Sequence, residues 1–269
     1  MIATSETAER DFYEGKWAQP DLSAGSLRNF LVKKERFFVR QLQGRQGRVL
    51  DLGCGGGWRL FTTVGPVLGV DLSRSSLRAA LALYAGGAQA DLAALPFADG
   101  AFDFVVSSDV LGHVPLERKD AVLAEIRRVL RPGGRTLHYV EAEGQDPLMA
   151  WARRDPALYE RHVVAPEGHV GMEPASHTFA RFRRAGFRPL AEVAAYRGLI
   201  YVGRVAQLFD NEYAARSRCL RALVGLCKAL SALAPLALAA NLVVSAALEV
   251  GDRLLPLDWA GGVMVCYER

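Results

Sequence analysis

The 269-residue chain has only four cysteines, and none of them stands in a C-x-x-C pair or at ligand spacing from a histidine. We therefore expect neither a disulfide framework nor a cysteine zinc site. The cysteine content fits a protein of the reducing cytoplasm. The first nineteen residues are polar and charged, and they lack the basic start and apolar run of a secretory signal. With 51% hydrophobic residues, the chain can instead build a sizeable hydrophobic core.

Lysine is scarce and arginine is abundant, and the formal net charge is +4. No RNA-binding module, aromatic-basic repeat or low-complexity tail accompanies these charges. We therefore expect a solvated, arginine-rich surface, and nucleic acid is not an expected partner. Several of the arginines lie in two groups, Arg127, Arg128, Arg131 and Arg135, and Arg181, Arg183, Arg184 and Arg188.

A glycine-rich turn follows the first apolar strand pattern. Residues 49–57 read VLDLGCGGG, so three alternate glycines follow Asp51. Glycine adopts positive φ without steric cost and lets the backbone approach a ligand closely. A helix after such a turn offers its free N–H groups to the ligand. The pattern predicts a nucleotide-cofactor loop.

The next apolar strand patterns in the chain also end in acidic residues. Residues 67–71 end on Asp71, twenty residues after Asp51, which is the spacing at which a carboxylate meets a ribose diol. A short third strand is predicted at 88–92 with Asp91, and a fourth at 104–109. The three acids therefore follow successive strands.

Two longer motifs narrow the class of cofactor. Residues 91–103 read DLAALPFADGAFD, a D-L-x-x-L-P-F-x-D-x-x-F-D segment, and residues 128–134 read RVLRPGG. With these motifs the chain resembles the class I S-adenosylmethionine-dependent methyltransferases, and within them the type 11-like small-molecule enzymes. The resemblance is dense over residues 45–142. It implies an α/β fold with a doubly wound, seven-stranded Rossmann-like sheet whose last strand is antiparallel.

Two other nucleotide-binding classes fit less well. The dehydrogenase fingerprint G-x-G-x-x-G would require a third glycine at position 58, where a bulky Trp58 opposes close packing of helix on strand. A P-loop would require G-K-[ST] after the glycines, and no such sequence follows them.

The resemblance also implies how S-adenosylmethionine binds, with S-adenosylhomocysteine as the product. Asp51 would orient the turn and reach the methionine ammonium, Asp71 would bind both ribose hydroxyls, and Asp91 would accept from the adenine amine. A helix cap or turn role is the alternative for each acid. The other implied contacts come from Gly53, Cys54 and Gly55 at the methionyl part, Leu72 beneath adenine, the Leu92 amide at the ring, and Ser108 near the methionine.

Residues 1–44 are predicted to form an N-terminal helical cap. This segment holds Phe12, Tyr13 and Trp17 in otherwise hydrophilic surroundings. The resemblance implies that a mobile N-terminal helix closes over the cofactor, with Tyr13 as its aromatic contact. Packing of the aromatic residues on the domain surface is the alternative.

Alternating strand and helix patterns predict a parallel-sheet core over 45–202 and 259–269. Between strands six and seven lies a long insertion, 203–258. Its residues 229–248 carry no charge and have the length of a membrane span, but they include Pro235 and polar side chains. If this segment crossed the bilayer once, the last strand would also lie on the opposite side of the membrane from the sheet that it has to complete. We therefore predict a helical hairpin, 204–233 and 236–255, serving as accessory core, acceptor lid, homodimer interface or peripheral membrane contact.

Methyl transfer to a hydroxyl requires an aligned acceptor and a base. His113, after strand four, and Glu141, after strand five, are predicted to lie above the carboxyl ends of the sheet. The resemblance implies a capping or packing role as the alternative for His113. His169, in the glycine-flanked segment PEGHVGME, is the favoured base or acceptor-binding residue. His138 is expected in the core. No metal site is expected, because the spacing of the histidines and acids at 162–177 matches no familiar ligand pattern.

The sequence thus predicts an S-adenosylmethionine-dependent methyltransferase that acts on a small, lipophilic metabolite, with O-methylation favoured. A membrane-lipid or quinone-pathway methyltransferase is one alternative. A cofactor-binding regulatory protein without methyl transfer is the alternative of another class.

Overall fold

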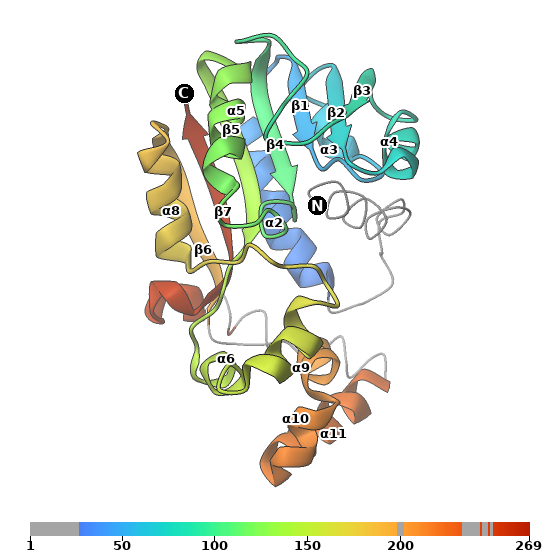
Figure 1. Cartoon of the computed structure of the whole chain (residues 1–269), viewed down its shortest axis with the longest axis vertical. Helices are drawn as coiled ribbons and strands as arrows, with labels where there is room; N and C mark the ends of the chain where they lie inside the picture. The colour runs from blue at the N-terminus through green and yellow to red at the C-terminus, as the bar shows by residue number, and fades with distance from the viewer. Residues whose placement is uncertain (1–26, 198–201, 233–242, 244–246, 248–249) are drawn as a thin grey trace, which may run out of the picture.

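The computed structural model describes residues 27–197, 202–232, 243, 247 and 250–269. Its centre is a seven-stranded sheet in the order β3-β2-β1-β4-β5-β7-β6 (Figure 1). Strands β1 to β5 pair in parallel, and β7 runs antiparallel to both β5 and β6. The predicted doubly wound sheet with an antiparallel last strand is confirmed. The strands are β1 Val49–Leu52, β2 Val67–Asp71, β3 Gly86–Gln89, β4 Phe102–Ser108, β5 Leu130–Glu141, β6 Arg188–Arg197 and β7 Ala260–Glu268.

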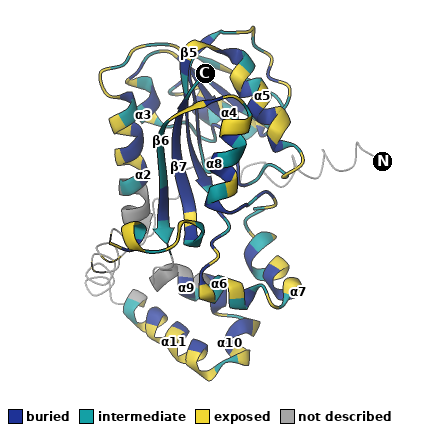
Figure 2. Cartoon of the chain, turned by 90° about the vertical axis from the view of Figure 1, so that its left-hand side faces the viewer, coloured by how far each residue is buried: buried dark blue, intermediate teal, exposed yellow. Residues whose placement is uncertain are grey.

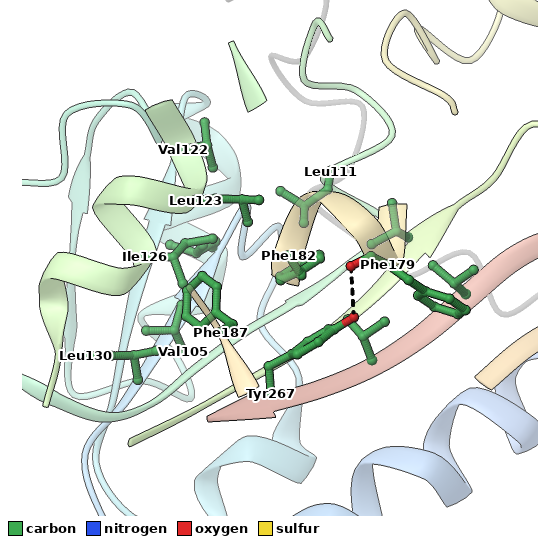
Figure 3. Close-up of a cluster of buried hydrophobic side chains, with 14 of the residues drawn as sticks. Val105, Leu111, Val122, Leu123, Ile126, Leu130, Phe179, Phe182, Phe187 and Tyr267 are labelled. Carbon is green, nitrogen blue, oxygen red and sulfur yellow. Dashed lines mark hydrogen bonds between the residues drawn. The ribbon is translucent and has the colours of Figure 1, made fainter. Parts of the chain in front are cut away.

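Helices cover both faces of the sheet. On one face, α5 (Lys119–Val129) and α8 (Ala175–Arg184) bury their apolar sides against the strands. Figure 3 shows this core, in which the Phe182 and Tyr267 rings stack at 4.8 Å between centroids. The opposite face is covered by α2 (Leu27–Leu42), α3 (Arg59–Thr62) and α4 (Arg74–Ala80). Successive strand residues alternate between the two cores, since side chains alternate across a pleated sheet.

The third strand lies nearer the N-terminus than predicted, at Gly86–Gln89, so Asp91 stands beyond the strand. Its first residues pair with Leu68 and Gly69 of β2. A Cβ at Gly87 would lie 2.6 Å from the Gly69 carbonyl oxygen, so only a glycine allows this close pairing.

The predicted helix 204–233 is wrong in one respect, because three helices occupy this part of the insertion. They are α9 Val202–Phe209, α10 Glu212–Arg216 and α11 Arg218–Ala232. Asn211 has extended backbone angles, and its side chain accepts from the Tyr213 amide, so it starts a new helix. Ser217 is also extended, and its hydroxyl accepts from the Leu220 amide. Of the predicted second arm, 243, 247 and 250–254 are helical, and the rest lies outside the described residues.

The insertion helices form a small unit with the segment between β5 and β6. Its partners there are α6 (Pro147–Ala152), α7 (Pro156–Tyr159) and a π-helix (Glu160–Val164), which share a third hydrophobic core with α9 to α11. In Figure 1 this unit lies beyond the end of the sheet to which β4 and β5 point. Figure 2 shows the strands mostly buried, whereas α10 and α11 carry many exposed residues.

The end of the insertion is fixed to the core. Asp252 pairs with Lys33 of α2 and accepts a 2.8 Å hydrogen bond from the Arg197 amide at the end of β6. Within the described residues, no helix has the length and apolarity needed to cross a bilayer.

Candidate active site

The predicted glycine turn joins β1 to α3. Gly53, Gly55 and Gly57 all have positive φ, of 57°, 50° and 81°. A Cβ at Gly53 would lie 2.6 Å from the Val110 side chain, so the loop after β4 packs directly on this turn. Cys54 is buried, with its sulfur packed toward Gly69 of β2. The turn conformation is therefore the one that the sequence predicted, and it also contacts a neighbouring loop.

Asp51 lies beneath the turn and is almost fully buried. Its Oδ2 accepts a 2.6 Å hydrogen bond from the Tyr84 hydroxyl, whose oxygen accepts from the Trp58 amide at 2.6 Å. Burial raises the pKa of Asp51 to about 7, although the Tyr84 hydrogen bond opposes the rise and the charge of Asp71 adds to it. Asp51 therefore holds the turn through Tyr84.

Asp71 and Asp91 shape the neighbouring loops. The Asp71 carboxylate accepts from the Gly55 amide at 2.9 Å and from the Ser73 amide at 2.8 Å. Asp91 accepts from the Ala93 amide at 2.9 Å and pairs with Arg118. Leu72 and Leu92, which follow these acids, are half-buried. Both carboxylates thus stand at the same edge of the sheet as the turn, as the sequence predicted, and both also stabilise backbone.

The end of β4 carries a second charged pair. The Ser108 hydroxyl donates a 2.6 Å hydrogen bond to Asp109, which also pairs with the buried Lys34 of α2. Asp109 has a φ of 60°, in the left-handed region that residues with a side chain rarely adopt. Asp109 thus holds a rare backbone conformation beside the turn.

His113, Glu141 and His169 come together at the carboxyl ends of β4 and β5. His113 follows β4, Glu141 is the last residue of β5, and His169 lies in the loop before α8. One ligand atom from each of the three lies within 4.8 Å of the others. His169 Nε2 stands 3.7 Å from Glu141 Oε1, and the His113 and His169 ring centroids are 4.6 Å apart. The three residues predicted separately as catalytic candidates therefore form one cluster.

The electrostatics of this cluster follow from its burial. Burial lowers the pKa of His113, although the Glu141 carboxylate opposes this. Burial alone would raise the pKa of Glu141, but the imidazoles of His169 and His113 hold it below its usual range. The His113 Nδ1–H donates to the Gly168 carbonyl oxygen at 3.0 Å, since a carbonyl can only accept. In the neutral ring the lone pair is then on Nε2.

The loops that carry the two histidines are bonded to each other. The Gly171 amide donates to the Gly112 carbonyl oxygen at 2.9 Å. A Cβ at Gly171 would lie 1.7 Å from the Val114 carbonyl oxygen, and a Cβ at Gly112 would lie 2.6 Å from Glu141 Oε2. Glycine at position 171 is therefore required for the two loops to approach this closely, and Gly112 leaves space for the Glu141 carboxylate.

The turn and the acids around it fit S-adenosylmethionine. A positive-φ backbone that admits close approach and a strand-end carboxylate bonded to that same backbone lie side by side at Gly55 and Asp71. A ligand whose amino-acid part binds the turn and whose ribose binds the carboxylate needs these two groups side by side. Tyr13, the predicted aromatic contact, lies outside the described residues.

Several residues of this region were missed in the sequence. Tyr84 and Arg118 bind Asp51 and Asp91, and Lys34 pairs with Asp109. Asp109 could have been suspected, because it ends the fourth strand pattern. Lys34 is one of two adjacent lysines in a helix pattern, and nothing in the sequence marks it as the buried one.

Most of the arginines of the basic surface are paired with acids. The pairs are Arg128 with Glu125 and Asp99, Arg131 with Asp103, Arg181 with Glu173 and Asp120, Arg183 with Glu192, and Arg188 with Glu268.

Comparison with known proteins places this chain among methyltransferases. Residues 50–138 match the family model described as a methyltransferase domain. A methyltransferase-family protein of Encephalitozoon cuniculi is 35% identical over 152 residues, which cover 49% of this chain and 70% of that protein. The ubiquinone biosynthesis O-methyltransferase of Chromobacterium violaceum is 27% identical over 68% of this chain and 78% of its own length.

The overall fold is also shared with solved structures. A phosphoethanolamine N-methyltransferase of Haemonchus contortus, solved with S-adenosylmethionine, superposes with a TM-score of 0.58 at 19% identity, over 97% of this chain and 59% of that one. Several other curated methyltransferases are matched over half of their length or less.

Proposed function

This chain belongs to the class I S-adenosylmethionine-dependent methyltransferases, and from that membership we propose that it methylates a hydroxyl group of a small, lipophilic metabolite. When bound, S-adenosylmethionine supplies an electrophilic methyl group on a positively charged sulfur. The turn at 53–57 and Asp71 would hold the amino-acid and ribose parts, with Asp51 supporting the turn from beneath.

The four cysteines are free thiols, which supports a cytoplasmic location.

One observation carries the choice of a hydroxyl acceptor. His113, Glu141 and His169 converge at the end of the sheet, and Val110, three residues before His113, packs on Gly53 of the turn. A hydroxyl must lose its proton at or before attack, and it must be held in line with the methyl group. The cluster offers two imidazoles and a carboxylate for these tasks, and His113 lies on the loop that packs on the turn.

The lipophilic character of the acceptor is inferred from the helical unit. This unit lies beyond the carboxyl ends of β4 and β5, and it has a hydrophobic core of its own. The ubiquinone biosynthesis O-methyltransferase to which the chain is similar bears O-methylation in its name. Five of the eight arginines in the two predicted groups pair with acids, which lowers the positive charge that this surface offers to nucleic acid.

The test is release of S-adenosylhomocysteine during incubation with a panel of small acceptors. The panel contains phenols and aliphatic alcohols, matched amines, and matched compounds whose only acceptor atom is carbon. We expect turnover with a hydrophobic hydroxyl compound, at least 100-fold reduced in His169→Ala, with S-adenosylhomocysteine affinity unchanged. The control is His177→Ala, which removes an exposed histidine of α8 and should keep wild-type turnover. Turnover confined to amines would contradict the proposal.

A membrane-resident acceptor, such as a lipid or quinone, is a second candidate. Apolar side chains of the insertion are widely exposed, with Leu226 56%, Val243 70% and Leu254 78% accessible. Such side chains suit contact with a lipid surface. Sedimentation with vesicles of mixed neutral and anionic lipids tests this. We expect Leu226→Glu and Leu254→Glu to weaken binding at least fivefold, whereas Leu81→Glu, at another exposed leucine, should not. Equal sedimentation of all variants would exclude this role for the insertion.

A further inference from the structure

The cluster of His113, Glu141 and His169 has the composition of a metal site. Two imidazoles and one carboxylate form the protein ligand set found in His₂Glu catalytic zinc sites and in 2-His-1-carboxylate iron sites. The three donors come from three separate segments, so their approach to within 4.8 Å is a property of the tertiary fold. Neighbours on one helix would approach in this way without any ligand role.

Glu141 carries an unsatisfied atom. Its Oε2 is buried and has no hydrogen-bond partner among the described residues. Leaving a buried carboxylate oxygen without a partner is destabilising, and in native proteins such groups accompany a catalytic role, a bound water or a bound ion. Its Oε1 faces His169 Nε2 at 3.7 Å, beyond hydrogen-bond distance. One carboxylate oxygen thus faces His169 beyond hydrogen-bond distance, and the other has no partner among the described residues.

His113 makes a hydrogen bond of the kind that metal-bound histidines make. Its Nδ1–H donates to the Gly168 carbonyl oxygen, next to His169 in the chain. Metal-binding histidines commonly donate their second ring N–H to a backbone carbonyl, which fixes the tautomer and turns the other nitrogen toward the metal. The same bond fixes the loop of His169, which the Gly171 amide also joins to the Gly112 carbonyl oxygen.

The separation between His169 and Glu141 is close to the one that a shared zinc ion needs. Ligand atoms about 2.0–2.1 Å from a tetrahedral zinc ion lie roughly 3.3 Å apart. The His169 Nε2 to Glu141 Oε1 separation of 3.7 Å is within half an ångström of that value. Both histidines lie on loops, where side-chain rotation can supply such a shift, while Glu141 is fixed at the end of β5.

We propose that His113, Glu141 and His169 bind one divalent first-row transition-metal ion, with zinc as the reference ion, and leave an open ligand position for the acceptor. Binding of the ion does not depend on the proposed function, but its role in catalysis does. In that role the acceptor hydroxyl oxygen takes the open position, and its proton passes to solvent. The oxygen then forms the new O–C bond, while the C–S bond breaks and its electron pair stays on sulfur.

The first experiment measures metal binding to the full chain. The protein is stripped with a chelator and titrated with Zn²⁺ by calorimetry, and the bound metal is counted by elemental analysis after desalting. We expect one equivalent in the wild type and at least 100-fold weaker binding in His169→Ala and in Glu141→Gln. Co²⁺ should give visible absorption bands in the wild type that both variants lack. His177→Ala and Cys219→Ser remove an exposed imidazole and an exposed thiol, and should bind like the wild type.

Folding of each variant is checked by its affinity for S-adenosylhomocysteine, which does not use the cluster, and a variant that fails this check is replaced by His113→Ala. Wild-type zinc affinity in folded cluster variants, or loss of binding in Cys219→Ser instead, overturns the metal site. Methyl transfer that persists at full rate in the metal-free enzyme overturns its catalytic role. One bound equivalent of zinc without turnover on any hydroxyl acceptor supports the metal site and counts against the proposed function alone.

Discussion

The Tyr84 hydroxyl lies 2.6 Å from both Asp51 Oδ2 and the Trp58 amide nitrogen. It donates to the carboxylate and accepts from the amide, so a single side chain joins β1 to the residue that follows the glycine turn. The ring also limits the space at Gly57, where a Cβ would lie 3.2 Å from Tyr84 Cζ. The cofactor turn is thus supported from below by a buried pair of side chains.

Tyr84→Phe removes both hydrogen bonds and keeps the ring. Because the buried Asp51 carboxylate and the Trp58 amide then lose a partner, we expect a loss of about 1–3 kcal/mol in unfolding free energy and roughly tenfold weaker binding of S-adenosylhomocysteine. Denaturant unfolding and calorimetry measure the two effects. Tyr159→Phe is the matched control, since the buried Tyr159 hydroxyl has no hydrogen-bond partner among the described residues. Equal losses in both variants would show that the bridge is unimportant.

Asp51→Asn tests the buried charge. Burial raises the pKa of Asp51 from 3.8 to about 7. The folded state therefore holds this proton more tightly than the unfolded state, and stability falls as pH rises from about 4 to about 7. Relative to wild type, the asparagine variant should gain stability over this range, by roughly 2–4 kcal/mol at pH 8. Urea unfolding at pH 4 to 8 measures the difference, and a constant difference across that range would contradict this ionisation.

Residues 45–142 were predictable because their chemistry is local. The glycines of the turn, Asp71 at the end of β2 and Glu141 at the end of β5 are fixed by strand periodicity, which places strand ends at a common edge. His113 and His169 could each be identified as candidates from the sequence. Their contact could not be predicted, because it depends on a hydrogen bond from the Gly171 amide to the Gly112 carbonyl oxygen, 59 positions apart in the chain.

The insertion was predicted least well, since its breaks depend on side-chain capping. The apolar pattern of 204–233 continues through Asn211 and Ser217, and only their hydrogen bonds to following amides show that the helix restarts there. Polar residues of these types also occur within helices, so the pattern could not place the two breaks. The packing of α9 to α11 on α6 and α7 had no visible signal either.

Phe209→Ala tests whether the helical unit contributes to acceptor binding. Phe209 is fully buried in the core of that unit, and its ring contacts Tyr213 at 5.5 Å between centroids. Truncation should cost about 3–5 kcal/mol, mostly as local loosening of α9 to α11. We expect the KM for the acceptor to rise at least tenfold while affinity for S-adenosylhomocysteine is kept. Hydrogen exchange should show faster exchange in α9 to α11 only, and an unchanged KM would separate this unit from the acceptor site.

His138 lies in the sheet, as expected for a core residue, and its bonds define its tautomer. The Thr136 hydroxyl donates to the Val105 carbonyl oxygen, so it accepts from His138 Nε2–H at 2.5 Å. The Ser107 hydroxyl, 2.7 Å from Nδ1, then donates to the ring. His138 is thus buried as a neutral imidazole with both nitrogens satisfied.

Burial lowers the pKa of His138 from 6.5 to about 3. Between these two pH values His138 is protonated in the unfolded chain but stays neutral in the folded protein. Stability is therefore lost as pH falls from about 6.5 towards 3. His138→Gln should cost about 1–2 kcal/mol at pH 7 through lost packing, but it should lack this acid-dependent loss, which reaches roughly 2–4 kcal/mol at pH 4. Urea unfolding of both proteins between pH 7 and 4 gives the difference. His177→Gln, at an exposed histidine, should follow the wild-type curve, and parallel curves for His138→Gln and wild type would mean that His138 ionises normally in the folded protein.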